Sequence, residues 1–321
     1  MEAVVLAGGY ATRLWPITRS QPKMLLPIGE SVVIDQVLEE LEADDRIENV
    51  YLSTNETFAE DFEAHIADSD LEKAQLSVED TSGESEKFGV VDALAQLVDR
   101  EGIEGEDLLV VAGDNLISFN MSEFIDHFES SPGPTLAAYN VGSPDRATAY
   151  GVLKMDGDRV TELQEKPDDP PSSLVSIGCY AFPGDAPSFD EYLQDDNNPD
   201  EPGWFIRWLV DREPVSAFTF DGAWFDIGTP QSYLETVAWH LGGENLVTDS
   251  ATLDNVDLGG NVHVLDGAEI SDTSLDHSII FPDATLRNCD VSDSIVDSNT
   301  VLEGLTLTDA LVGENTRIGG D

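Results

Sequence analysis

The sequence predicts an α/β domain built on a mixed, mainly parallel sheet, followed by a parallel β-helix. Two observations carry this prediction. In the first part of the chain, short apolar runs alternate with segments of helical periodicity, as in βαβ units. After Gly243, apolar residues instead recur every 16 positions, a period that no helix has. We therefore expect two domains, over residues 1–243 and 244–321.

The first strands are expected at the apolar runs 3–7, 49–53 and 108–112, which are typical of strands buried on both faces of a parallel sheet. The segments 31–43 and 90–100 between them carry apolar residues at helical spacing. In a sheet of this kind, ligands bind at the carboxyl ends of the strands. We therefore look for functional residues just after each apolar run.

Further along, the segments 135–141, 151–156 and 174–182 predict an antiparallel or mixed extension of the sheet. A helix over 233–241 closes this half of the chain. It is expected to end at Gly242-Gly243, because glycine is the usual residue just after a helix.

The C-terminal repeat describes coils of three short strands, because apolar residues follow one another at steps of 6, 5 and 5. One series of residues 16 apart consists of Ile270, Leu286, Leu302 and Ile318. The register slips by one at Gly259-Gly260, so we expect an irregular first coil. The turns resemble those of the hexapeptide-repeat, left-handed β-helix.

The charge balance excludes several classes of partner. The 321 residues include 15 basic and 65 acidic ones, a formal net charge of −50. Cations that could neutralise nucleic-acid phosphates are scarce, and an anionic membrane surface would repel the chain. No apolar run is long enough to span a bilayer. We expect neither a nucleic-acid nor a membrane partner.

The same acidity predicts a salt-adapted protein. Self-repulsion at this charge is screened in molar salt, where the Debye length is about 3 Å. An ordinary acidic protein with divalent cations on its surface is the alternative. The distant Cys179 and Cys289 indicate no disulfide framework. Because a strand is expected from Ala3 onward, we expect no signal peptide. We expect a cytoplasmic protein of a halophile.

The richest motif follows the first strand. Gly8 and Gly9 let the backbone approach a polyphosphate and offer N–H groups to an anion. Arg13 adds a forked donor and Lys23 a mobile positive charge. A Gly-Gly pair by itself is also consistent with a tight strand-to-helix turn. The dinucleotide fingerprint Gly-x-Gly-x-x-Gly is absent.

The complete string from Leu6 to Lys23 resembles the opening signature of sugar-phosphate nucleotidyltransferases, Gly-Gly-x-Gly-Thr-Arg-Leu-x-Pro-x-Thr followed by Pro-Lys. The resemblance continues along the first 240 residues and includes the β-helical tail. It implies a Rossmann-like catalytic domain in which Leu6, Ala7, Gly8 and Gly9 contact the nucleotide. The family's third glycine is Ala11 here.

The resemblance also implies a magnesium site. Asp114 follows the predicted strand 108–112 in a Gly-Asp-Asn turn, and Asp226 lies in Trp-Phe-Asp-Ile-Gly-Thr-Pro. In the family, these two aspartates hold the catalytic Mg²⁺. Two carboxylates suit Mg²⁺, whose remaining positions are left to phosphate and water. An isolated Gly-Asp-Asn is equally typical of a helix cap.

Sugar and base recognition are assigned to other motifs by the same resemblance. Glu165 is expected to accept hydrogen bonds from sugar hydroxyls and Lys166 to hold the sugar phosphate, although an isolated Glu-Lys-Pro is usually a charged turn. Lys23 and Lys166 are two of only five lysines. The resemblance also assigns Gly151 and Gly178 to the sugar. It assigns Gly89 and the acidic residue Glu84 to the base.

The resemblance therefore implies an enzyme that joins a hexose 1-phosphate to a nucleoside triphosphate and releases pyrophosphate. The Gly-Asp-Asn turn favours glucose 1-phosphate with dTTP or UTP, and guanylyl transfer to mannose 1-phosphate is the alternative. Arg13 and Lys23 would stabilise the leaving group, and Lys166 would position the nucleophile. A non-catalytic regulatory subunit and a β-helical acyltransferase are less consistent with the motifs. The β-helix is expected to support a homo-oligomer.

Overall fold

The computed structural model describes residues 1–79, 89–186, 188–194 and 197–319. The chain folds into two compact units. The first unit comprises Met1–Gly9 and Ile34–Trp224, and the second comprises Tyr10–Val33 and Phe225–Asp321. The domain boundary expected at residue 243 stays a prediction. No helix among the described residues has the length and apolarity that a bilayer crossing requires.

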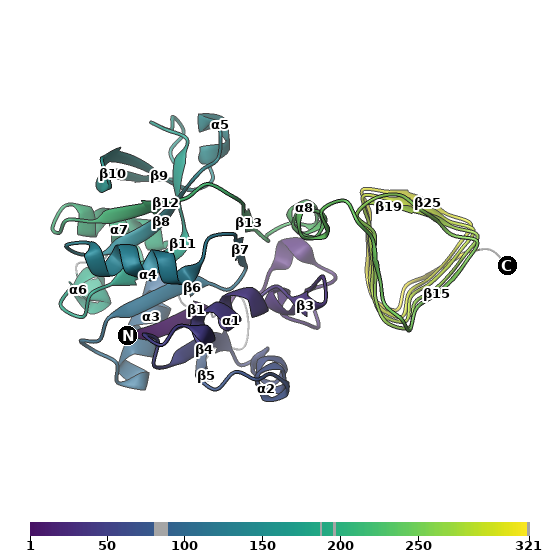
Figure 1. Cartoon of the computed structure of the whole chain (residues 1–321), viewed down its shortest axis with the longest axis horizontal. Coiled ribbons are helices and arrows are strands. Elements are labelled where there is room, and N and C mark those ends of the chain that lie inside the picture. Colours follow the sequence, from purple (N-terminus) through teal and green to yellow (C-terminus); the bar gives the residue numbers. More distant parts are fainter. Residues whose placement is uncertain (80–88, 187, 195–196, 320–321) are drawn as a thin grey trace. The chain divides into compact units, whose positions relative to one another are not determined.

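The first unit is built on a nine-stranded mixed sheet (Figure 1). Its parallel part has the order β5-β4-β1-β6. The bounds are β1 (Glu2–Leu6), β4 (Val50–Asn55), β5 (Ala74–Glu79) and β6 (Leu108–Ala112). Three of these strands match the predicted apolar runs. β5 carries alternating exposed and buried residues, which is why no apolar run marks it.

The remaining strands extend the sheet from β6 in the order β11-β8-β12-β10-β9. β12 pairs parallel with β8, and the other neighbours in this part are antiparallel, which confirms the mixed extension. The bounds are β8 (Thr135–Asn140), β9 (Gly151–Asp156), β10 (Arg159–Glu165), β11 (Leu174–Phe182) and β12 (Ser216–Thr219). A short strand, β7 (Asn115–Ile117), follows β6 directly.

Helices connect these strands, and α3 covers the whole segment predicted at 90–100. The bounds are α1 (Asp35–Ala43), α2 (Ala59–Asp68), α3 (Val90–Glu101), α4 (Met121–Ser130), α5 (Pro144–Ala147), α6 (Phe189–Gln194) and α7 (Pro202–Val210). The helix predicted to begin at residue 31 begins at Asp35. The reason is that β2 (Pro27–Ile28) and β3 (Ser31–Val32) form a hairpin whose turn uses Gly29 at φ 62°.

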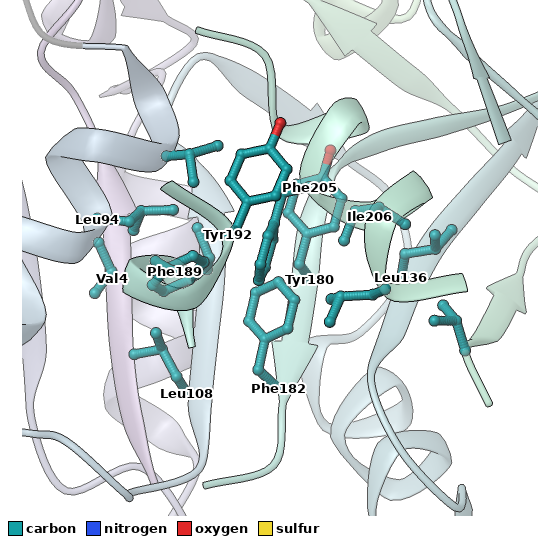
Figure 2. Packing of buried hydrophobic residues seen from close by; sticks show 14 of the residues in the cluster. Val4, Leu94, Leu108, Leu136, Tyr180, Phe182, Phe189, Tyr192, Phe205 and Ile206 are labelled. Atoms are coloured by element: carbon teal, nitrogen blue, oxygen red, sulfur yellow. The ribbon is translucent and has the colours of Figure 1, made fainter. Parts of the chain in front are cut away.

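Aromatic side chains fill the space between the sheet and the helices α3, α6 and α7 (Figure 2). The ring of Phe205 lies 4.8 Å from Phe189 and 5.3 Å from Tyr192, measured between centroids. Each fully buried side chain of this size contributes about 1.5–3 kcal/mol of apolar burial. This packing fixes α7, and with it the position of the residues that begin that helix.

The second unit contains a parallel β-helix with three strands per coil, seen end-on as a triangle in Figure 1. Ile279 pairs with Ile295 and Ile295 with Leu311, steps of 16 residues, as the repeat predicts. Leu246 pairs with His263, a step of 17, which confirms the irregular first coil. Corner residues such as Asn299 adopt positive φ, a conformation that Asn and Asp tolerate.

The strands of the β-helix form three sheets. The first contains β14 (Leu246–Val247), β17 (His263–Val264), β20 (Ile279–Ile280), β23 (Ile295–Val296) and β26 (Leu311–Val312). The second contains β15 (Thr252–Asp254), β18 (Glu269–Ser271), β21 (Thr285–Arg287), β24 (Val301–Glu303) and β27 (Arg317–Ile318). The third contains β16 (Asp257–Leu258), β19 (Ser274–Asp276), β22 (Asp290–Ser292) and β25 (Thr306–Thr308).

The rest of the second unit consists of β2, β3, two 3₁₀ turns and α8 (Pro230–Leu241). The turns are η1 (Thr12–Leu14) and η2 (Lys23–Leu25). α8 begins before the predicted residue 233, because Thr229 and Ser232 form a capping box there. It ends at Gly242 with φ 61°, the predicted stop.

Candidate active site

The Gly-Gly loop of the first unit follows β1 at the carboxyl edge of the parallel strands. Its path is fixed by side chains of β4: Asn55 Nδ2 donates to the Gly8 carbonyl at 2.9 Å, and Thr54 Oγ1 donates to the Ala7 carbonyl at 3.3 Å. A Cβ built on Gly9 would meet no described atom within 4 Å, so the backbone there is open to a ligand. The Leu6 carbonyl accepts from Gly113 N at 2.9 Å, which places the Gly-Asp-Asn turn beside this loop.

The Asp114 carboxylate is oriented by its neighbour in the chain. Asn115 Nδ2 donates to Asp114 Oδ1 at 2.8 Å, and Asn115 Oδ1 accepts from Trp224 Nε1. Trp224 is the first residue of β13 (Trp224–Asp226). Gly178 packs behind this turn, because a Cβ at Gly178 would lie 2.6 Å from the Ala112 Cβ. Gly178 is therefore required here for close packing.

Glu165 ends β10 in a cradle of two glycines. A Cβ on Gly151 would lie 3.0 Å from Glu165 Oε2, and a Cβ on Gly203 would overlap the same oxygen. Burial raises the pKa of Glu165, and the nearby charge of Glu201 raises it further. One side of the Glu165 carboxyl group is thus closely enclosed by the backbone of Gly151 and Gly203.

Both the backbone and the ammonium group of Lys166 make specific contacts. Its backbone adopts φ 45°, a left-handed conformation that is costly for a lysine, and its N–H donates to the Tyr150 carbonyl at 3.0 Å. Its ammonium group pairs with the Glu201 carboxylate. Tyr150 packs against Trp224 with ring centroids 5.0 Å apart. A continuous series of contacts therefore links Lys166 to Asp114.

The second unit holds the other predicted residues. Arg13 lies in η1 and packs against Gly228, where an added Cβ would be 2.8 Å from Arg13 Nη2. Gly228 N donates to the Asp226 carbonyl at 3.0 Å, so Arg13 lies close in the fold to the turn that carries Asp226. Lys23 begins η2 and is buried. Arg13, Lys23 and Asp226 thus belong to one compact unit, and the remaining predicted residues that the structure describes belong to the other.

The base-reading prediction is only partly covered by the structure. Glu84 lies outside the described residues. Gly89 caps α3, and a Cβ there would overlap the Pro199 carbonyl. The structure adds Glu79, at the end of β5, which sequence reasoning did not select. Its carboxyl group is buried, accepts from Ser53 Oγ at 3.1 Å and lies beside Gly8, where an added Cβ would be 3.2 Å from Glu79 Oε1. Burial raises the pKa of Glu79.

The donors present are suitable for magnesium. In the first unit, Asp114 offers a carboxylate whose orientation is fixed by an amide. In the second unit, Asp226 ends β13 with a carboxylate of its own. Carboxylate oxygens are the ligands that Mg²⁺ prefers. In the parts of the chain that the structure describes, no cluster of three or more His, Cys, Asp or Glu side chains converges as a metal cage.

The fold and these motifs define a class of transferase. The profile of the family described as nucleotidyl transferase matches residues 2–240. The chain belongs to this family, as the signature from Leu6 to Lys23 predicts.

Its relatives have several names. A Sulfolobus acidocaldarius protein, provisionally named a mannose-1-phosphate guanyltransferase, is 32% identical over 237 residues, which are 73% of this chain and 61% of that protein. The bifunctional protein GlmU of Methanocaldococcus jannaschii is 27% identical over 277 residues, 84% of this chain and 61% of that protein. The chain thus spans about three fifths of the length of both relatives. A glucose-1-phosphate thymidylyltransferase of Streptomyces griseus is 27% identical in an alignment that covers 92% of this chain and 86% of that protein.

A solved structure has the same fold. It is a Bacillus anthracis protein, provisionally described as a glucose-1-phosphate thymidylyltransferase, in complex with sucrose. The match has a TM-score of 0.65 at 25% sequence identity and covers 75% of this chain and 95% of the other.

Proposed function

We propose that this protein transfers a nucleotidyl group from a nucleoside triphosphate to a hexose 1-phosphate and releases pyrophosphate. The supporting observation is the series of contacts from Asp114 through Asn115, Trp224 and Tyr150 to Lys166. It holds a carboxylate suited to a metal ion and a cation suited to a sugar phosphate in a fixed relationship. That arrangement suits a reaction in which two phosphate-bearing substrates must meet.

Catalysis by these residues would consist mainly of positioning and charge neutralisation, because phosphoryl and nucleotidyl transfer need little covalent participation from the protein. Lys166 would hold the attacking phosphate, and Glu165 would accept hydrogen bonds from sugar hydroxyls. The open backbone at Gly9 would admit the triphosphate. Arg13 and Lys23 would stabilise the pyrophosphate as it leaves. Mg²⁺, held by Asp114 and Asp226, would neutralise phosphate charge.

The pair formed by Lys166 and Glu201 bears on substrate entry. Both side chains are more than a third exposed, so the ion pair is screened and weak. An incoming phosphate carries more charge than one carboxylate and would take over the ammonium group. In the absence of substrate, the Glu201 carboxylate would hold the Lys166 ammonium group in place.

For the substrates, we favour glucose 1-phosphate with dTTP or UTP, because the Gly-Asp-Asn turn resembles that branch of the family. Guanylyl transfer to mannose 1-phosphate is the second candidate, and Glu79 favours it. Guanine presents two adjacent N–H donors on its pairing edge, and a carboxylate beside the Gly-Gly loop could accept both. The relatives carry both kinds of name.

The test is pyrophosphate release in about 2–3 M KCl, where screening offsets the protein's own charge. Mg²⁺ is supplied, and a grid of sugar 1-phosphates is combined with ATP, CTP, GTP, UTP and dTTP. A signal with glucose 1-phosphate and dTTP or UTP supports the favoured substrates. A signal confined to GTP and mannose 1-phosphate supports the second candidate. In that case, Glu79→Gln should selectively lower the activity with GTP. If folded protein releases no pyrophosphate with any combination of substrates, both candidate functions are contradicted.

A further inference from the structure

One outer face of the β-helix is buried, although the outward positions of its other two sheets are largely exposed. His263, Ile279 and Ile295 pair with one another across β17, β20 and β23, and each is 0% exposed. Their neighbours in sequence, Val264, Ile280 and Val296, fill the interior of the coils. Because side chains alternate along a strand, the first three point outward. We call His263, Ile279 and Ile295 the ladder face.

The other sheets show what an uncovered outward position carries. Glu269 and Arg287 on the second sheet, and Asp276 and Asp290 on the third, are charged and exposed. Apolar side chains at the corresponding outward places of the first sheet therefore indicate a face that packs against other parts of its own unit. Those parts are Tyr10–Val33 and the stretch that contains α8.

Contacts at one end of the ladder face involve the hairpin after Lys23. The His263 ring lies beside the backbone of Gly29 and beside His240 of α8. A Cβ on Gly29 would overlap the His240 ring, so the Gly29 backbone packs directly against that ring. Tyr233 of α8 donates from its hydroxyl to the Pro27 carbonyl at 2.6 Å. The hairpin that follows Lys23 is thus fixed from several directions.

A contact in a later coil reaches the same segment at Pro16. A Cβ on Gly313 would lie 2.5 Å from Cγ of Pro16, so the Gly313 backbone packs directly on the proline ring. Gly313 itself is rigid: its carbonyl accepts from Thr316 Oγ1 at 2.6 Å and from Thr300 Oγ1 at 3.2 Å. Pro16 is three residues after Arg13.

We propose that the β-helix is a positioning element for the catalytic cations. The ladder face contacts the segment Tyr10–Val33 at Gly29, and Gly313 contacts it at Pro16. These contacts thereby fix Arg13 and Lys23, which that segment carries. The inference rests on the proposed nucleotidyl transfer, in which these two cations bind the triphosphate. It gives the β-helix a role within the single chain, separate from any part in assembly.

The test is Gly313→Ala, with Gly260→Ala as the matched control. Both glycines lie in the β-helix and neither has a left-handed φ, but a Cβ on Gly260 meets only one atom, at an ordinary 3.5 Å. We expect Gly313→Ala to raise KM for the nucleoside triphosphate roughly tenfold, because small displacements of binding groups are costly. KM for the sugar 1-phosphate should stay unchanged, since Glu165 and Lys166 belong to the other unit. Gly260→Ala should change neither.

Hydrogen–deuterium exchange supplies a readout that needs no turnover. In Gly313→Ala, amides of residues 10–33 should exchange faster while those of the coils keep their protection. Unchanged exchange in that segment, or KM values for both substrates that rise together, would overturn the inference. A wild-type protein without nucleotidyl transfer refutes the proposed function; the exchange experiment then decides separately whether the β-helix holds the segment.

Discussion

Asn115 donates from its side-chain amide to Asp114 Oδ1 at 2.8 Å, and its own Oδ1 accepts from the indole of Trp224. Indole nitrogen is only a donor, so Trp224 fixes which end of the Asn115 amide faces the carboxylate. The orientation of the proposed metal ligand therefore depends on a tryptophan 110 positions later in the chain. Asn115 and Trp224 are positioning residues for Asp114.

Replacing the indole tests this dependence. Trp224→Phe keeps an aromatic ring for Tyr150 and removes the N–H donor, which frees the Asn115 amide to rotate away from Asp114. We expect Mn²⁺ binding, measured by calorimetry or paramagnetic resonance, to weaken about tenfold, close to the 1.4 kcal/mol expected for one lost hydrogen bond. Trp239→Phe, at an exposed tryptophan, is the control. Equal Mn²⁺ affinity in both variants would contradict the positioning role.

The enclosure of Glu165 leads to a second prediction. Gly203→Ala places a methyl group where the Glu165 carboxyl group lies, while alanine favours the helix α7 in which residue 203 sits. The carboxyl group must move, so we expect KM for the sugar 1-phosphate to rise at least tenfold with little change for the nucleotide. Steady-state kinetics with each substrate varied in turn provide the measurement. A parallel loss for both substrates would indicate general damage to the fold.

Much of the fold was predictable because its signals are local or periodic. The apolar runs at β1, β4 and β6 and the 16-residue step that aligns Ile279 with Ile295 are visible in the sequence. The signature motif identified the family for a similar reason, since it is a continuous string. The strand β5 was missed because alternate positions in it are polar.

The candidate site was less predictable where it depends on contacts between distant residues. Glu79 was overlooked because its selection needs the end of β5 and the proximity of Gly8, neither of which spacing reveals. The role of Gly203 depends on an overlap with a side chain 38 positions earlier. Ile279 and Ile295 did carry a signal, since they are large apolar residues at outward positions of a repeat whose other outward positions are mostly charged or polar.

The signature loop contains a strained residue. Ala11, which replaces the family's third glycine, adopts φ 46° and ψ 44°. A left-handed conformation costs a residue with a Cβ roughly 1–2 kcal/mol, and glycine loses part of that advantage through its greater freedom in the unfolded chain. We expect Ala11→Gly to raise the free energy of unfolding by about 0.5–1 kcal/mol, measured by denaturant titration. Asn299→Gly, at a left-handed corner that asparagine tolerates, is the control and should show a smaller gain.

The buried His263 makes stability depend on pH. Its pKa is lowered to about 4, first by burial and then by the charge of His240, which together outweigh a hydrogen bond to the Gly29 backbone that raises it. An unfolded histidine titrates near 6.5, so between pH 6.5 and pH 4 the unfolded chain binds more protons than the folded one. The stability associated with neutral His263 is thus fully present above pH 6.5 and is lost as the pH falls toward 4.

The expected size of this effect is about 2 kcal/mol between pH 7 and pH 5, from the two pKa values and the linkage relation. Denaturant unfolding in high salt at both pH values provides the measurement. His263→Ile continues the apolar series of Ile279 and Ile295, and should remove this part of the pH dependence while preserving the fold. His277→Asn, at a partly exposed corner, should leave it in place. If His263→Ile unfolds with the wild-type pH slope, the imidazole is not the titrating group, and its burial against Gly29 is a matter of packing alone.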